Sequence, residues 1–121
     1  MFLRFVITQL DDVSHKPQGL FVAADNLIES GALSAEERLQ LREVIIWFNK
    51  NLPTPRSMVA SRAIFWFKSS AHECIKQMWE LTQVLGHHGY LVEVEKCRVL
   101  GNIIYEDKFQ VAAYPSKHDR K

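Results

Sequence analysis

Residues 62–96 most constrain the fold, because a strand-like run, a helix-like run and a second strand-like run follow one another with short connections. The first run, RAIFWFK at residues 62–68, carries large apolar side chains at both odd and even positions, which predicts a central strand buried on both faces. The last run, YLVEVEK at residues 90–96, alternates apolar and acidic side chains, which predicts a strand with one solvated face. We therefore expect a sheet with a helix packed on it.

Helices are predicted over three segments, roughly 18–30, 35–50 and 71–86, where apolar residues recur at helical spacing. Ser34 and Glu37 fit the S-x-x-E capping box, in which the hydroxyl and the carboxylate satisfy free backbone N–H groups at a helix start. Ser70 and Glu73 repeat the pattern, so a second capping box is predicted at the start of the third helix.

Three further segments complete the predicted fold. Residues 2–10 read as a first strand, and the segments GNIIYE and KFQVAAY read as two strands joined by a turn near Glu106 and Asp107. We expect the last three strands to form an antiparallel meander. The predicted fold class is α+β, a two-layer sandwich with a mixed, mostly antiparallel sheet of about five strands in the order β-α-α-β-α-β-β-β. Helices would cover one face, and the other would carry Arg4, Glu93, Glu95, Lys108 and Gln110.

The length of 121 residues predicts one domain, over residues 1–115, followed by a flexible basic tail at 116–121. The formal net charge of +1 argues against a dedicated nucleic-acid-binding or membrane-surface protein, because this chain lacks the strong basic field that either function would need. The apolar start at residues 1–10 is too short for a membrane span. Two cysteines without metal-type spacing indicate reduced thiols and a cytoplasmic location.

The corner between the strand at 62–68 and the following helix gathers polar side chains. Lys68, Ser69, Ser70 and His72 lie where free backbone N–H groups and the helix dipole favour an anion, and Arg98 lies beside a strand end that could join them. A phosphate or carboxylate site is one interpretation. An ordinary helix start is the other, because the corner lacks the glycines of a phosphate-binding loop.

Other groupings favour structural roles. His87 and His88 are adjacent, so their side chains diverge on a helix and are typical of a helix C-terminus. Cys74 falls on the inner face of its helix, whereas Cys97 lies beside Arg98 at a strand end. No metal site and no cofactor is predicted.

The leading hypothesis is a small non-catalytic protein–protein interaction module. Its uncovered, partly apolar sheet face would pair with a larger partner or with a second copy in a homodimer. The alternative is a small enzyme or an anion- or ligand-binding protein with its site near residues 68–73 and 97–98. Core packing is expected for most of Trp47, Trp66 and Trp79. Trp79 is predicted at the edge of the inner face of its helix, and any one of the three that is exposed would mark a binding surface.

Overall fold

The computed structural model describes residues 1–7, 19–52 and 63–114. Residues 8–18 and 53–62, and the whole predicted tail at 116–121, lie outside the described residues. The elements are β1 (Phe2–Ile7), α1 (Leu20–Ser30), α2 (Ala35–Asn51), β2 (Ile64–Lys68), α3 (His72–His87), β3 (Val92–Cys97), β4 (Ile103–Glu106) and β5 (Gln110–Ala113). This order and the α+β fold class confirm the prediction.

The five described strands form one sheet in the order β3-β1-β2-β5-β4, and every described pairing is antiparallel. β2 is a central strand, as predicted. β2 and β3 both run antiparallel to β1, which lies between them, so β2, α3 and β3 form a split β-α-β unit. The predicted meander of the last three strands is wrong, because β3 pairs with β1 at one edge while β4 and β5 form a hairpin at the other.

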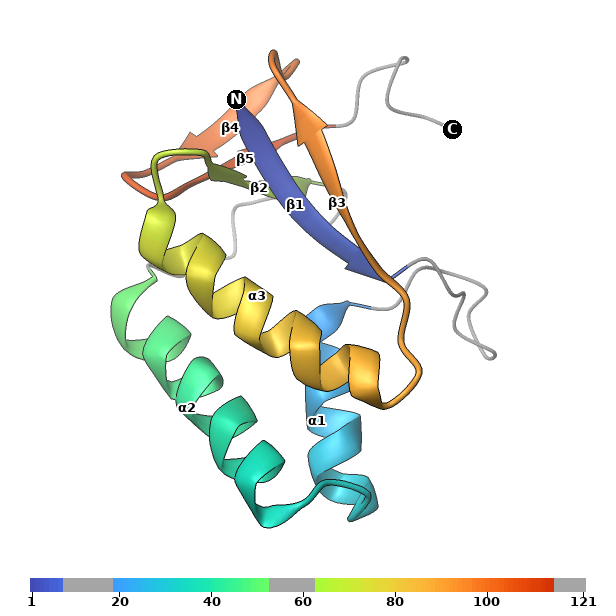
Figure 1. Ribbon diagram of the computed structural model, residues 1–121. Helices are drawn as coiled ribbons and strands as arrows, with labels where there is room; N and C mark the ends of the chain where they lie inside the picture. The colour runs from blue at the N-terminus through green and yellow to red at the C-terminus, as the bar shows by residue number, and fades with distance from the viewer. Residues whose placement is uncertain (8–18, 53–62, 115–121) are drawn as a thin grey trace.

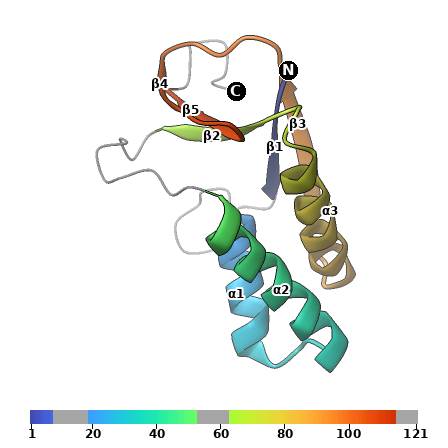
Figure 2. The ribbon, with the colours of Figure 1, turned by 90° about the vertical axis from the view of Figure 1, so that its left-hand side faces the viewer.

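The sheet is strongly twisted. β1 is in register with β3 along six residues but with β2 only at Phe2–Lys68 and Leu3–Phe67. In Figure 2, β2, β5 and β4 are therefore steeply inclined to β1 and β3. Figure 1 shows the three helices gathered on one side of the sheet, with α3 running below β1 and β3.

The main core lies between this side of the sheet and the helices. Alternation in β1 turns Phe5 and Ile7 toward the helices, where both are buried. The apolar stripe of α2 ends in Phe48, whose ring centroid lies 6.0 Å from that of Phe67 on β2. Each large side chain buried in this way contributes roughly 1.5–3 kcal/mol. The buried core residues of the helices include Leu20, Ala23, Ala24, Leu27, Leu41, Val44, Cys74, Met78, Leu81, Val84 and Leu85.

A second, smaller core occupies the opposite face of the sheet. Trp66, Val111 and Ala113 are buried there beneath Leu100, which belongs to the connection between β3 and β4. The sequence predicts that this face is uncovered and partly apolar, but the chain's own Leu100 covers its apolar centre. Gln110, predicted on this face, lies instead in register with Phe67, whose ring contacts Phe48 of α2, and is buried.

The two predicted capping boxes have different outcomes. At α2 both hydrogen bonds are present: the Glu37 N–H donates to Ser34 Oγ, and the Ser34 N–H donates to Glu37 Oε1, each at 3.1 Å. The second capping box is wrong, because α3 begins at His72 after Ala71, with no side-chain cap. The Lys68 carbonyl accepts from the Ala71 N–H at 2.9 Å, and this turn moves the helix start past Ser70.

Candidate functional site

The sheet brings the sequence-predicted corner residues to one end of the fold. Cys97 of β3, Phe2 of β1 and Lys68 of β2 lie in one cross-strand row. Residues 68–72 and 97–98 therefore approach the same end of the sheet. Lys68 Nζ lies 2.6 Å from Glu106 Oε2, and its side chain is about one-quarter exposed.

The other corner residues lie at the surface. Ser69, Ser70, His72 and Arg98 are exposed, and the Ser69 N–H donates to the Met1 carbonyl at 3.1 Å. An anion at this corner would compete with the Glu106 carboxylate for the ammonium group next to it. The predicted anion site therefore stays a prediction.

The carboxylate of Asp107 is hydrogen-bonded within the turn between β4 and β5. Asp107 accepts from the Tyr105 hydroxyl at 2.5 Å, the Phe109 N–H at 2.8 Å and the Gln110 N–H at 3.0 Å. Burial acts to raise the pKa of Asp107, but these hydrogen bonds outweigh it and lower the pKa overall. The same contact raises the pKa of Tyr105. Asp107 thus stabilises the turn, and both of its carboxylate oxygens already accept hydrogen bonds.

Arg4 joins two parts of the face opposite the helices. Its guanidinium lies 2.8 Å from Glu95 on β3, and its Cζ lies 5.0 Å from the centre of the Trp66 ring on β2. Arg4 and Glu95 are thus on the same face of the sheet, as the sequence predicts. Arg4 Nε is buried and has no hydrogen-bond partner among the described residues. The guanidinium therefore makes two contacts on this face, the ion pair with Glu95 and a cation–π contact with the Trp66 ring.

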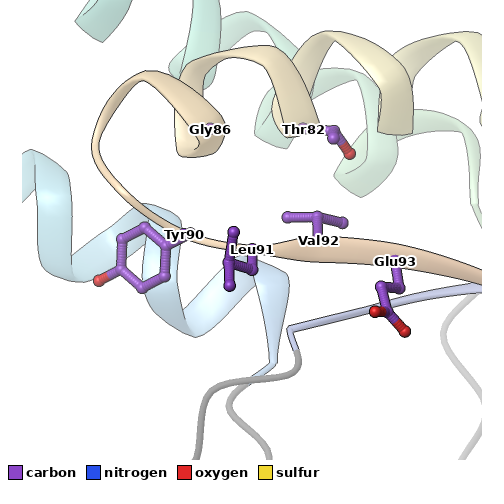
Figure 3. Close-up of a pocket in the computed structure, with 6 residues that line it drawn as sticks. All are labelled: Thr82, Gly86, Tyr90, Leu91, Val92 and Glu93. Atoms are coloured by element: carbon purple, nitrogen blue, oxygen red, sulfur yellow. The ribbon is translucent and has the colours of Figure 1, made fainter.

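A hollow of about 490 Å³ opens between the C-terminal half of α3 and the start of β3 (Figure 3). Its lining residues are Thr82, Gly86, Tyr90, Leu91, Val92 and Glu93. A Cβ built on Gly86 would have no other atom within 4 Å, so the absence of a side chain there leaves the hollow open. We call the surface between α3 and β3 that contains this hollow the α3–β3 groove.

The α3 wall of the groove carries an exposed aromatic ring. Trp79, Thr82 and Gly86 recur at i, i+3 and i+7, which places them on one face of the helix. Trp79 is 49% exposed, and its ring packs edge-on against Phe5 with centroids 5.2 Å apart. The contact with Phe5 holds one side of the ring in the core and leaves the other side to solvent.

The β3 wall of the groove follows from strict alternation. Val92 and Val94 pack against the main core and are half-buried, whereas Glu93 is exposed. Figure 3 shows Val92 directed toward α3 and Glu93 directed to the other side of the strand. Leu91, just before β3, is 63% exposed. The groove therefore has a mixed lining, in which Leu91 and Val92 are apolar and Thr82, Tyr90 and Glu93 carry polar groups.

Sequence reasoning did not find the groove. The YLVEVEK alternation and the position of Trp79 at the helix edge were both visible, and both are confirmed. The hollow itself depends on how α3, which carries Gly86, packs against the segment that carries Leu91. Local patterns contain no such signal.

Comparisons with known proteins give no family. No protein-family model, no curated protein and no solved structure matches this chain. Within residues 1–7, 19–52 and 63–114, no helix has the length and apolar character needed to cross a membrane. Within the same ranges, no three or more His, Cys, Asp or Glu side chains are grouped so that they could hold a metal ion.

Proposed function

We propose that this protein is a non-catalytic protein-binding module whose contact surface is the α3–β3 groove. The observation that carries the proposal is the half-exposed Trp79 ring, which lies on the same face of α3 as Thr82 and one turn before it, where Thr82 lines the hollow. Tryptophan is enriched among the residues that dominate binding energy, particularly next to pockets that exclude water. The Phe5 contact also fixes the ring before binding, so little side-chain freedom is lost when a partner covers it.

The surface differs from the one that the sequence predicts. The face opposite the helices is closed at its centre by Leu100, and Arg4 lies over Trp66. Two of the exposed apolar side chains lie on the two walls of the groove: Leu91, which lines the hollow, and Trp79 on α3. Lys68 of the predicted corner pairs with Glu106, and Asp107 of the β4–β5 turn accepts hydrogen bonds from within the turn. These contacts favour a binding role over a catalytic one.

The test is a selection of short peptide ligands from a random display library, followed by affinity measurement on variants. We expect Trp79→Ser and Leu91→Ser to weaken the selected peptides at least about tenfold, which is the usual loss when an apolar contact worth about 1.4 kcal/mol is removed. Ile46→Ser is the matched control, because Ile46 on α2 is 63% exposed, like Leu91, but lies outside the groove.

Two results would contradict the proposal. One is a set of ligands that bind wild type, Trp79→Ser and Leu91→Ser equally well. The other is a selection that yields no ligand. Thermal melting of each variant shows whether a loss of binding reflects the surface or the fold.

A further inference from the structure

β3 is the edge strand next to the groove, and its outer side has no partner strand among the described residues. The direction of its backbone groups follows from the ladder. The Ser69 N–H donates to the Met1 carbonyl, so hydrogen-bonded pairs of β1 with β2 occur at odd positions of β1, including Leu3. The even positions of β1, including Arg4, then bond to β3, because backbone direction alternates along a strand.

This alternation fixes what β3 presents outward. Glu93 and Glu95 are in register with even positions of β1, so their N–H and C=O groups are directed to β1. The N–H and C=O groups of Val92, Val94 and Lys96 are therefore directed outward. An extended segment added here would hydrogen-bond to these three residues, as in peptide recognition by β-strand addition.

Side chains of an added strand would divide between two surroundings. Those level with Val92 and Val94 would enter the α3–β3 groove, where the hollow beside Gly86 has room for them. Those level with Glu93 and Glu95 would lie on the opposite face of the sheet, next to carboxylates. The edge therefore favours an added strand with alternating side chains, in which apolar residues face the groove and cationic residues lie on the face of Glu93 and Glu95.

A second copy of this chain fits the edge poorly. In a two-fold antiparallel pairing of β3 with itself, facing residues must share a sheet face, so Glu93 and Glu95 would oppose each other or themselves. Like charges directly opposite are destabilising, and they are closest in pairs that are not hydrogen-bonded, as these would be. Arg4 already neutralises Glu95, whereas Glu93 is in register with Val6 and has no ion pair among the described residues.

We propose that β3 receives an extended segment of another protein as an added strand, in which a Lys or Arg residue facing Glu93, the carboxylate that Arg4 leaves without an ion pair among the described residues, alternates with apolar residues that fill the hollow beside Gly86. The proposal rests on the protein-binding function above and specifies the chemistry of the partner.

The probe is a short synthetic peptide in which lysine and valine alternate. Two matched peptides accompany it: one with glutamate in place of lysine, and one with the same lysines and valines in two blocks. We expect the alternating lysine peptide to bind about tenfold more tightly than either, since charge and register both contribute. Amide hydrogen exchange followed by NMR should slow at Val92, Val94 and Lys96 on binding, whereas the amides of Glu93 and Glu95 already bond to β1.

Two variants locate the effect. Glu93→Lys should reverse the preference in favour of the glutamate–valine peptide, and Glu43→Lys, the same charge change on the exposed side of α2, should not. Gly86→Leu should weaken the lysine–valine peptide about tenfold by filling the hollow. It should not lower the melting temperature, because leucine has a higher helix propensity than glycine and its Cβ meets open space. Glu43→Leu is the matched control.

The outcomes separate this inference from the proposed function. Equal binding of the three peptides, or unchanged exchange at Val92 and Val94, would overturn strand addition. If Trp79→Ser still weakened the library-selected ligands in that case, the binding function would stand with another mode of recognition. If no selected ligand depended on Trp79 or Leu91, both proposals would be wrong.

Discussion

His88 Nε2 lies 3.0 Å from Glu37 Oε2, and this contact ties the C-terminal end of α3 to the first turn of α2 across 51 residues of sequence. Glu37 already accepts from the Ser34 N–H as part of the capping box. The nearby His87 Nδ1 lies 3.9 Å from the same oxygen. One carboxylate therefore both begins a helix and joins two helices.

Replacing Glu37 by Gln should lower the melting temperature, with a pH dependence of known sign. The Ser34 N–H is the main cause that lowers the pKa of Glu37, and the His88 hydrogen bond adds to it. A carboxyl whose pKa is lowered in the folded state stabilises above its ordinary pKa, and loses this effect as the pH falls through the folded value. The difference from wild type, measured by circular dichroism, should be largest near neutral pH and should shrink once the pH falls below the ordinary glutamate pKa of 4.5.

Glu36→Gln is the control for this prediction, because Glu36 lies in the same first turn and is exposed. Its effect should be smaller at every pH. A Glu37→Gln deficit that stayed constant on acidification would mean that charge at Glu37 is not the cause.

Leu100→Ala should open the second core. Burying Leu100 over Trp66 and Val111 is what closes the face opposite the helices. Truncating a buried leucine costs about 2–5 kcal/mol, and we expect a value near the lower end, about 2 kcal/mol, because a loop residue leaves a site that can relax. Urea unfolding should show this loss of free energy.

Val99→Ala is the neighbouring control, since Val99 is 82% exposed and should change the free energy of unfolding by less than about 0.5 kcal/mol. Equal effects at the two positions would show that Leu100 does not hold the second core together.

Arg4→Ala should destabilise through two contacts at once. The side chain pairs with Glu95 and stacks over Trp66, and both contacts are partly solvent-accessible. Together they are worth about 1–2 kcal/mol, and Arg4→Lys should recover only part of it, because an ammonium group stacks less well on an aromatic ring. Urea unfolding measures both. Lys96→Ala, at an exposed position of β3, should be close to neutral. If Arg4→Lys matched wild type, charge alone would account for the effect.

The sequence predicted the elements and their faces well because those depend on local periodicity. The alternation in residues 90–96 placed Val92 and Val94 inward and Glu93 outward, as the structure has them. The order of strands was harder, because an alternating pattern states which face is buried and not which strand lies beside it. The pattern of β3 was equally compatible with pairing to β4 in a meander and with pairing to β1, which is what the structure has.

Contacts between residues far apart in sequence were not predictable, such as those of His88 with Glu37 and of Leu100 with Trp66. The hollow of the candidate site is lined by α3 and by the start of β3, so it exists only once these two elements pack together. The failed capping box has a local cause instead. The turn after Lys68 starts α3 one residue late, so Glu73 occupies the second helical position rather than the third.

The two thiols should differ sharply in their reaction with an alkylating reagent in the folded protein. Burial is the main cause that raises the pKa of Cys74 to about 11, and the nearby Asp107 carboxylate adds to it, so Cys74 stays a protonated thiol at neutral pH. Cys97 is only half-buried, at the end of β3, where its Sγ donates to the Val99 carbonyl at 3.0 Å. Mass spectrometry should find Cys97 modified first, with Cys74 modified at the rate of unfolding. In urea both should react alike. Modification of Cys74 ahead of Cys97 in the native protein would contradict the burial of Cys74 between α3 and the sheet, and with it the packing that forms the α3–β3 groove.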